Sequence, residues 1–292
     1  MTALICLGLG YSAEHFVKDF GAKFDQIVGT VRSAERVAAL TAGNAGRLEA
    51  LVFDGKTATD ELRRAIAAAD AALISIPQDA AGDPVLRAFG DAFAQAPRLR
   101  AIVYLSTVGV YGDHRGGWVD EQTSVAPASA RSRRRLAAEE AWQALGARRG
   151  ITVAVLRLAG IYGPGQNALL QIARGKARRI VKPGQIFNRI HVADIARAID
   201  AAFTRCASGV FNIADDEPAP PADPIVFAAQ LMGRAAPPEE KFDDVAASLS
   251  PMALSFWEEC RRVKNDKLKR ALGVTLRYPT YRDGLRALFE KP

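Results

Sequence analysis

The chain has 292 residues, of which 49% are hydrophobic and 24% are charged, and its 39 basic and 32 acidic residues give a formal net charge of +7. This length and apolar content indicate a globular protein with one large domain or two unequal ones. The basic residues are scattered and are not interleaved with aromatic ones, so we expect no nucleic-acid partner. A basic balance also suits an enzyme that takes phosphorylated or carboxylated ligands, and we therefore expect an anionic small-molecule substrate.

The three cysteines, Cys6, Cys206 and Cys260, are far apart and odd in number. This pattern favours neither a disulfide framework nor a metal cluster, and we expect buried thiols in a reducing compartment. The opening segment lacks a basic leader, and nowhere do 18 uncharged apolar residues run together. We expect a cytoplasmic protein with no metal and no membrane contact.

Short β-branched apolar runs alternate with alanine-rich helical stretches through the first half of the chain. Such alternation predicts βαβ units and a parallel sheet covered by helices on both faces. The predicted strands span residues 4–9, 26–31, 48–53, 71–76, 101–106 and 152–158. After a Gly/Pro-punctuated insertion, FNRIHVADIARAIDAAF predicts a helix with Asp194 as its N-cap, and GVFNIAD predicts one more strand.

The predicted fold class is α/β, a Rossmann-type doubly wound parallel sheet with a smaller C-terminal substrate domain. The sheet domain should comprise residues 1–165, rejoined by residues 188–213. The smaller substrate-binding domain should comprise residues 166–187 and 214–292. Within the second range, DEPAPPADP at residues 216–224 predicts a rigid connector to a C-terminal helical portion.

The stretch CLGLGYSAEHF follows the first predicted strand and opens a helix. Gly8, Gly10 and Ala13 have the G-x-G-x-x-A spacing: the first glycine permits a tight turn, the second lets a pyrophosphate approach, and the alanine lets helix and strand pack closely. Free N–H groups at this helix start, around Tyr11 and Ser12, then face the phosphates of a dinucleotide. The alternative is a tight turn without a ligand.

The second predicted strand ends in GTVRS, without the carboxylate that usually accepts the ribose hydroxyls of NAD. Arg32 suits a charge-assisted contact with a 2′-phosphate, worth about 1.5 to 3 kcal/mol, and Thr30 and Ser33 lie beside it. The sequence therefore favours NADP over NAD. A solvated arginine at a helix start is the alternative.

Two more strand ends belong to the predicted cofactor pocket. Asp54 follows the third strand, where it either accepts a hydrogen bond from the adenine amino group or forms an ordinary Asp-Gly turn. Ser75, Ile76 and Pro77 follow the fourth strand, at the carboxyl edge of the sheet where ligands of doubly wound folds bind. We expect backbone contact with the cofactor there.

A resemblance to a known family becomes specific after the fifth strand, in YLSTVGVYGDHRGGWVDE. Ser106-Thr107 precede Tyr111-Gly112 by four residues, and RLAGIYGPG and FNRIHVADIA follow in the expected order. The chain resembles the extended short-chain dehydrogenase/reductases, the NAD(P)-dependent epimerase/dehydratase family, and especially its atypical YeeZ-like proteins. The resemblance implies a nicotinamide cofactor, a homodimer and a substrate-polarising role for Thr107.

The chain departs from that family where a Tyr-x-x-x-Lys pair is expected on a helix, because SARSRRRLAAEEAW aligns Arg131 and Arg135 with it. Arginine, with a pKa above about 12, cannot exchange a proton near neutrality, and loss of a positioned acid–base typically costs about 10²- to 10⁴-fold in rate. We expect Arg135 to contact the cofactor ribose or the substrate, and both arginines to act as fixed cations for a carboxylate, phosphate or oxyanion. They share a helix face with four predicted core residues: Ala138, Ala141, Trp142 and Leu145.

Four further residues are candidates near the reaction centre. Tyr111 is either a packed ring of the VYG motif or a replacement acid–base, and His114 in the following loop either titrates near neutral pH or is simply exposed. Tyr162, in GIYGPG, lies near the expected nicotinamide end, and Asn188 is a candidate substrate contact.

Two functions fit these residues. The first is an NADP-dependent oxidoreductase or epimerase-like enzyme acting on a small carbonyl or sugar-like substrate, with Thr107 as polariser and no tyrosine acid–base. The second is an NADP(H)-binding sensor or regulatory protein without turnover. Thr107 favours the enzyme, whereas Arg131 counts against ordinary reduction.

Overall fold

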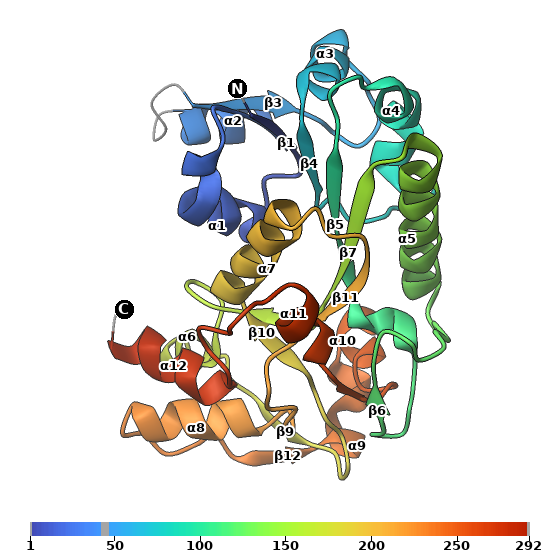
Figure 1. The fold of residues 1–292 in the computed structure, drawn as a ribbon. Helices are drawn as coiled ribbons and strands as arrows, with labels where there is room; N and C mark the ends of the chain where they lie inside the picture. The colour runs from blue at the N-terminus through green and yellow to red at the C-terminus, as the bar shows by residue number, and fades with distance from the viewer. Residues whose placement is uncertain (1, 42–46, 291–292) are drawn as a thin grey trace.

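A seven-stranded parallel sheet forms the centre of the molecule in the computed structural model, which describes residues 2–41 and 47–290 (Figure 1). Its strands lie in the order β11-β7-β5-β4-β1-β2-β3. Because the chain order reverses between β1 and β4, the carboxyl edge at this point is where a doubly wound fold binds its ligand. The strands are β1 Ala3–Leu7, β2 Gln26–Val31, β3 Leu48–Val52, β4 Ala71–Ile74, β5 Ala101–Thr107, β7 Thr152–Leu158 and β11 Gly209–Ile213.

All six strands predicted in the first half are present, but β1 and β4 end two residues earlier than predicted. The apolar residues that follow them form turns that approach each other instead of extending the sheet. The Ser75 hydroxyl donates to the Gly8 carbonyl at 2.5 Å, and Gly8 has a φ of 102°. The apolar residues next to Gly8 and Ser75 are buried or half-buried beneath these turns. In the sequence, such residues resemble the continuation of a buried strand.

Helices cover both faces of the sheet, which confirms the predicted doubly wound α/β class (Figure 1). One core cluster joins α1, α2 and α7 to the sheet through side chains such as Phe16 and Ile195. The other joins α3, α4 and α5 to the opposite face through side chains such as Phe89 and Trp142. These helices span α1 Tyr11–Phe20, α2 Ala34–Thr41, α3 Asp60–Ala68, α4 Pro84–Gln95, α5 Ala130–Arg149 and α7 Val192–Thr204.

The remaining elements form a C-terminal lobe and the segments that join it to the sheet. A separate apolar cluster in this lobe includes Tyr162, Leu169, Ile225 and Tyr281. Three short parallel strand pairs lie outside the central sheet: β6 Trp118–Val119 with β13 Arg262–Val263, β8 Gly160–Tyr162 with β10 Arg189–His191, and β9 Arg179–Val181 with β12 Glu239–Lys241. The other helices are α6 Ala168–Ala173, α8 Asp223–Leu231, α9 Phe242–Val245, α10 Pro251–Ser255, α11 Asp266–Ala271 and α12 Tyr281–Glu290, with short 3-10 turns at Gly21–Lys23, Val108–Tyr111 and Ala246–Ser248.

The segment that carries α11 packs differently from the rest of the C-terminal portion. Val263, Leu268 and Leu272 belong to the main core cluster of the sheet. By packing, this segment therefore joins the sheet, although it lies in the range 214–292 expected for the smaller domain. The expected division into two domains otherwise remains a prediction.

The start of α7 differs from the expectation. His191, and not Asp194, is its N-cap, because the His191 Nδ1 accepts from the Ala193 N–H at 3.1 Å. The Asp194 carboxylate instead accepts from the N–H groups of Arg277 and Tyr278, at 2.6 and 3.0 Å, and so fixes a distant loop to this helix.

Burial of the cysteines also differs from the expectation, since Cys6 is buried, Cys260 is half-buried and Cys206 is exposed. On α5, Ala141 is exposed and Glu139 is buried in the face that was expected to be apolar. In the part of the chain that the structure describes, no helix is long and apolar enough to cross a membrane.

Candidate active site

The glycine-rich turn after β1 is braced from two sides. The Gly8 N–H donates to Thr30 Oγ1 on β2 at 2.8 Å, and the Ser75 hydroxyl holds the Gly8 carbonyl. A Cβ at Gly8 would lie 2.8 Å from side-chain atoms of both Ser75 and Ile76. With its positive φ as well, this position admits only glycine.

Gly10 faces open space at the start of α1. It is the N-cap residue, no side chain caps the helix, and a Cβ at Gly10 would meet nothing within 4 Å. The first N–H groups of α1, at Tyr11, Ser12 and Ala13, are therefore left uncapped beside an open space, as a phosphate site requires. The Tyr11 hydroxyl reaches across to the Pro164 carbonyl at 2.8 Å, in the loop after β8.

The end of β2 carries an exposed cation. Thr30 is buried and its hydroxyl is committed to the glycine turn, so it supports that turn. Arg32 and Ser33 follow on the surface. Among residues 2–41 and 47–290 no carboxylate lies within ion-pair distance of Arg32, and the Glu14 carboxylate pairs with Arg36 at 2.5 Å.

Asp54 makes a turn after β3. Its Oδ1 accepts from the N–H groups of Thr57 and Lys56 at 2.9 and 2.8 Å, and these bonds lower the pKa of the carboxyl. Ile76 is half-buried and Pro77 exposed at the end of β4. The turn accounts for Asp54 structurally, and its contact with adenine stays a prediction.

Thr107 ends β5 and remains half-buried. Its Oγ1 accepts from the Gly109 N–H at 3.1 Å, so the hydroxyl hydrogen is available to another acceptor. Ser132, in the first turn of α5, stands across Gly109 from it, because a Cβ at Gly109 would lie 3.4 Å from both hydroxyl oxygens. Sequence reasoning missed Ser132, because its proximity to Thr107 depends on how α5 packs on the end of β5.

Tyr111 is a packed ring. It is fully buried, its hydroxyl donates to Asn212 Oδ1 at 2.8 Å, and the Arg157 guanidinium lies 4.8 Å from its ring centre. Burial raises the pKa of this phenol. A phenol so enclosed does not reach a substrate, which corrects its candidacy as a catalytic residue.

A buried ion pair lies beside this ring. Arg157 on β7 contacts both carboxylate oxygens of Glu139 on α5, the shortest N–O distance being 2.7 Å, and the two side chains are 6% and 1% exposed. The Ser106 hydroxyl donates to the same carboxylate. These bonds fix α5 to the carboxyl ends of β5 and β7, and thereby set where its first turn lies relative to Thr107.

The two arginines at the family's Tyr-x-x-x-Lys positions have different surroundings. Arg131 is exposed on the first turn of α5. Arg135 is 9% exposed, and its Nη1 donates to the Leu105 carbonyl at 2.9 Å and to the Tyr104 hydroxyl at 3.4 Å. Arg135 is therefore held against β5, two residues before Thr107.

The three candidate substrate residues are engaged with nearby backbone. The Tyr162 hydroxyl donates to the Thr280 carbonyl at 3.3 Å, and burial raises its pKa. The Asn188 side chain donates to the carbonyl of Arg261, just before β13, and accepts from the Val263 N–H in β13. The His114 ring lies 3.1 Å from a carbonyl of the preceding turn. The first two help to hold the C-terminal lobe on the sheet, and a substrate contact for all three stays a prediction.

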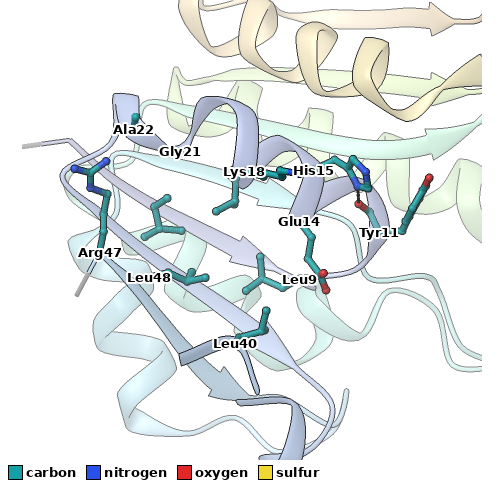
Figure 2. A pocket seen from close by; sticks show the side chains of 12 residues that line it. Leu9, Tyr11, Glu14, His15, Lys18, Gly21, Ala22, Leu40, Arg47 and Leu48 are labelled. Carbon is teal, nitrogen blue, oxygen red and sulfur yellow. Dashed lines mark hydrogen bonds between the residues drawn. The ribbon is translucent and has the colours of Figure 1, made fainter. Parts of the chain in front are cut away.

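A groove of about 650 Å³ lies next to the glycine-rich turn, between α1, α2 and the start of β3 (Figure 2). Figure 2 shows Leu9, Leu40 and Leu48 gathered in it, with Glu14 near its rim. All its lining residues lie between positions 9 and 48, so the groove includes no residue from the ends of β4 and β5. It is distinct from the surroundings of Thr107. Among the described residues, no cluster of three His, Cys, Asp or Glu is placed to hold a metal ion.

Comparison with known proteins gives a family match over part of the chain and a fold over nearly all of it. The model of the NAD dependent epimerase/dehydratase family matches residues 84–214. A solved structure described as a functionally unknown conserved protein from Silicibacter pomeroyi DSS is 43% identical, covers 99% of both chains and superposes with a TM-score of 0.87.

More distant structures share the architecture. The dTDP-glucose 4,6-dehydratase of Bacillus anthracis, solved with NAD, is 17% identical over 99% of this chain and 96% of its own, with a TM-score of 0.80. A human epimerase family protein, solved with NADPH, is 18% identical over the whole of both chains, with a TM-score of 0.74. Likeness at these identities shows the fold alone.

A curated relative is similar over part of its length. The 3-diazoavenalumate denitrifying reductase of a Streptomyces species is 32% identical over 142 residues, which is 45% of this chain and 45% of the relative. The match therefore spans less than half of that reductase.

Proposed function

We propose that the chain is an NADP-dependent oxidoreductase or epimerase-like enzyme of the NAD dependent epimerase/dehydratase family, whose model matches residues 84–214. Its proposed substrate is a small carbonyl or sugar-like compound with an anionic group. Thr107 polarises the substrate, and no tyrosine serves as acid–base. The partial match to a curated reductase supports the reaction class.

The observation that carries the cofactor assignment is the open turn at Gly10. A Cβ at Gly8 would lie too close to the Ser75 and Ile76 side chains, whereas Gly10 adjoins open space and uncapped N–H groups. These residues of the turn therefore fit a pyrophosphate. Structural neighbours were solved with NAD and with NADPH, so the preference has to come from this chain. The exposed Arg32 at the end of β2 supports NADP.

The chemistry follows from the groups around Thr107. A bound reduced nicotinamide supplies hydride. The Thr107 hydroxyl donates to the substrate oxygen and stabilises the negative charge that develops there. Because Arg131 does not release a proton at neutral pH and Tyr111 is enclosed, the proton that completes the alcohol comes from water, with Thr107 and Ser132 orienting it.

The first test is a fluorescence titration of the protein with NADPH and NADH, repeated on Arg32→Ala. We expect NADPH to bind at least about tenfold tighter and the variant to lose this preference, since one charge-assisted contact is worth about 1.5 to 3 kcal/mol. Arg64→Ala is the control, because Arg64 is an exposed arginine of α3. If neither dinucleotide binds at millimolar concentration, the proposed function is wrong.

A second candidate is an NADP(H)-binding sensor or regulatory protein without turnover. Two observations favour it: an exposed arginine, Arg131, stands at the family's tyrosine position, and Tyr111 is enclosed, so neither residue supplies a phenol to the Thr107 region. NADPH oxidation measured with a panel of 2-oxo acids, aldehydes and keto sugars separates the two. Turnover that is lost in Thr107→Ala and retained in Thr107→Ser supports the enzyme, whereas tight NADPH binding without turnover supports the sensor.

A further inference from the structure

The described part of the chain buries two arginines, and they are satisfied differently. Arg157 is 5% exposed and pairs with both carboxylate oxygens of Glu139. Arg135 is 9% exposed, but its hydrogen bonds run only to the uncharged oxygens of Leu105 and Tyr104. Removing an ion from water costs several kcal/mol, and among residues 2–41 and 47–290 no carboxylate lies within ion-pair distance of Arg135 to offset this cost directly.

Neutral groups hold the Arg135 guanidinium in place. The Tyr104 hydroxyl is fully buried and accepts from both Arg135 Nη1 and the side-chain amide of Gln78. The buried carboxylate of this cluster is that of Asp83, and its oxygens accept hydrogen bonds from groups other than Arg135. Its Oδ2 accepts from the Trp142 indole N–H at 3.1 Å, and its Oδ1 accepts from two N–H groups at the start of α4.

The guanidinium retains donors for a ligand. Within residues 2–41 and 47–290, the hydrogen bonds of Arg135 use only Nη1, and its buried Nε has no partner. A guanidinium presents five N–H donors in a planar fork that matches the two oxygens of a carboxylate or phosphate. A lysine at this position would offer a point charge without that fork.

The cluster also lies at a useful place on the sheet. Gln78 directly follows Ser75–Pro77, the segment predicted to contact the cofactor, and Leu105 precedes Thr107 by two residues on β5. Arg135 therefore bonds directly to β5 near Thr107 and, through the Tyr104 hydroxyl, is linked to the segment after β4 that is expected to contact the cofactor.

We propose that Arg135 is a preformed receptor for an anionic oxygen group, a phosphate or a carboxylate, and that Tyr104 and Gln78 are positioning residues that fix the guanidinium without neutralising it. The inference deepens the proposed function and rests on it for the source of the anion, which is either the dinucleotide or the substrate. The receptor itself stands on the geometry of Arg135.

The test is calorimetric titration of wild type, Arg135→Gln and Tyr104→Phe with inorganic phosphate, oxalate, NADPH and NADH. We expect Arg135→Gln to weaken binding of the recognised anion by about 10- to 100-fold, as loss of a charge-assisted fork does. Tyr104→Phe keeps the ring and should weaken it by about 3- to 10-fold. In the double variant the Tyr104 effect should vanish, because Tyr104 acts through Arg135.

Tyr111→Phe is the matched control. Tyr111 is also fully buried and also loses a side-chain hydrogen bond, to Asn212, but it lies outside the Arg135 cluster. Its thermal stability should fall about as much as that of Tyr104→Phe, with anion affinity unchanged. A purely structural role for Tyr104 would make the two variants alike in every titration, and would overturn its assignment as a positioning residue.

The ligands distinguish the sources. If Arg135→Gln loses affinity equally for NADPH and NADH, the anionic group belongs to a part that both dinucleotides share. If the variant loses affinity for oxalate at saturating NADPH, the anionic group belongs to the substrate. Equal affinities of wild type and Arg135→Gln for all four ligands overturn the inference. If phosphate or oxalate binds through Arg135 while neither dinucleotide binds, the proposed function fails and the receptor stands.

Discussion

Removing the Glu139 carboxylate should destabilise the protein strongly. In Glu139→Ala the Arg157 side chain, 6% exposed, keeps its charge without a counterion, and the Ser106 hydroxyl loses its acceptor. Breaking a buried pair by removing one partner costs about 3–5 kcal/mol, and an orphaned neutral hydrogen bond adds about 1 kcal/mol. At about 2–4 °C per kcal/mol for a large domain, the midpoint of thermal unfolding should fall by about 10–20 °C.

The assay is thermal unfolding followed by circular dichroism, at 0.1 M and 1 M NaCl. The loss should be nearly independent of salt, because salt screens buried pairs weakly. Glu240→Ala is the matched control, since it removes a similar ion pair, with Arg178. The side chains of Glu240 and Arg178 are 31% and 39% exposed, so solvent screens the pair and its loss should lower stability far less. Equal losses in the two variants would refute the argument that burial of the Arg157 charge sets the magnitude.

Three tests address the glycine-rich turn, the buried Asp215 and the buried His191. Gly8→Ala should lower both stability and dinucleotide affinity, because the added Cβ meets side-chain atoms at 2.8 Å. Gly10→Ala should lower dinucleotide affinity alone, because the added Cβ enters open space. Thermal melts and NADPH titrations separate these effects. Burial raises the pKa of Asp215 to about 8, so in the native state this carboxyl keeps a proton that the unfolded chain releases near pH 4. The contribution of this carboxyl to stability is thus present below pH 4 and lost as the pH rises through about 8. Asp215→Asn should therefore raise the midpoint of thermal unfolding at pH 9 but hardly at pH 4. A constant difference between the variant and wild type across this range would contradict the assignment. Burial lowers the pKa of His191 to about 4, so stability should fall as the pH drops from about 6.5 through 4, and His191→Gln should flatten this part of the urea-unfolding profile.

The order of strands and helices was predictable because it depends on local pattern. Apolar runs of about six residues between amphipathic stretches have few alternatives to buried parallel strands. The same reasoning overextended β1 and β4, because residues such as Leu9 are buried by a turn and not by the sheet. Hydrophobicity alone does not distinguish these two kinds of burial.

Predictions about single side chains failed where a distant partner decides the outcome. Periodicity assigned Ala141 to the buried face of α5, whereas Glu139 is buried because Arg157, from β7, neutralises it. Asp194 resembles an N-cap in sequence, yet it accepts hydrogen bonds from a loop more than eighty residues away. The sequence contains both partners of each contact but not their proximity.

The site was predictable to the extent that chemistry restricts residue type. Gly8 is required by a positive φ and by close contacts, so its spacing to Gly10 carried real information. Ser132 escaped prediction because nothing in the sequence shows that Thr107 lies across Gly109 from it.

The different surroundings of the two arginines decide what reaction this site can support. Arg131 is exposed, so solvent screens its charge and its position is weakly fixed, whereas Arg135 is 9% exposed and is held against β5. A reaction that needs proton transfer from a side chain gains from neither. Hydride transfer to a carbonyl next to an anionic group gains from Arg135 throughout, because the cation offsets the negative charge before and after the hydride arrives. Substrate binding should therefore depend on Arg135 more than the hydride step does, so that KM rises more than kcat falls when Arg135 is replaced.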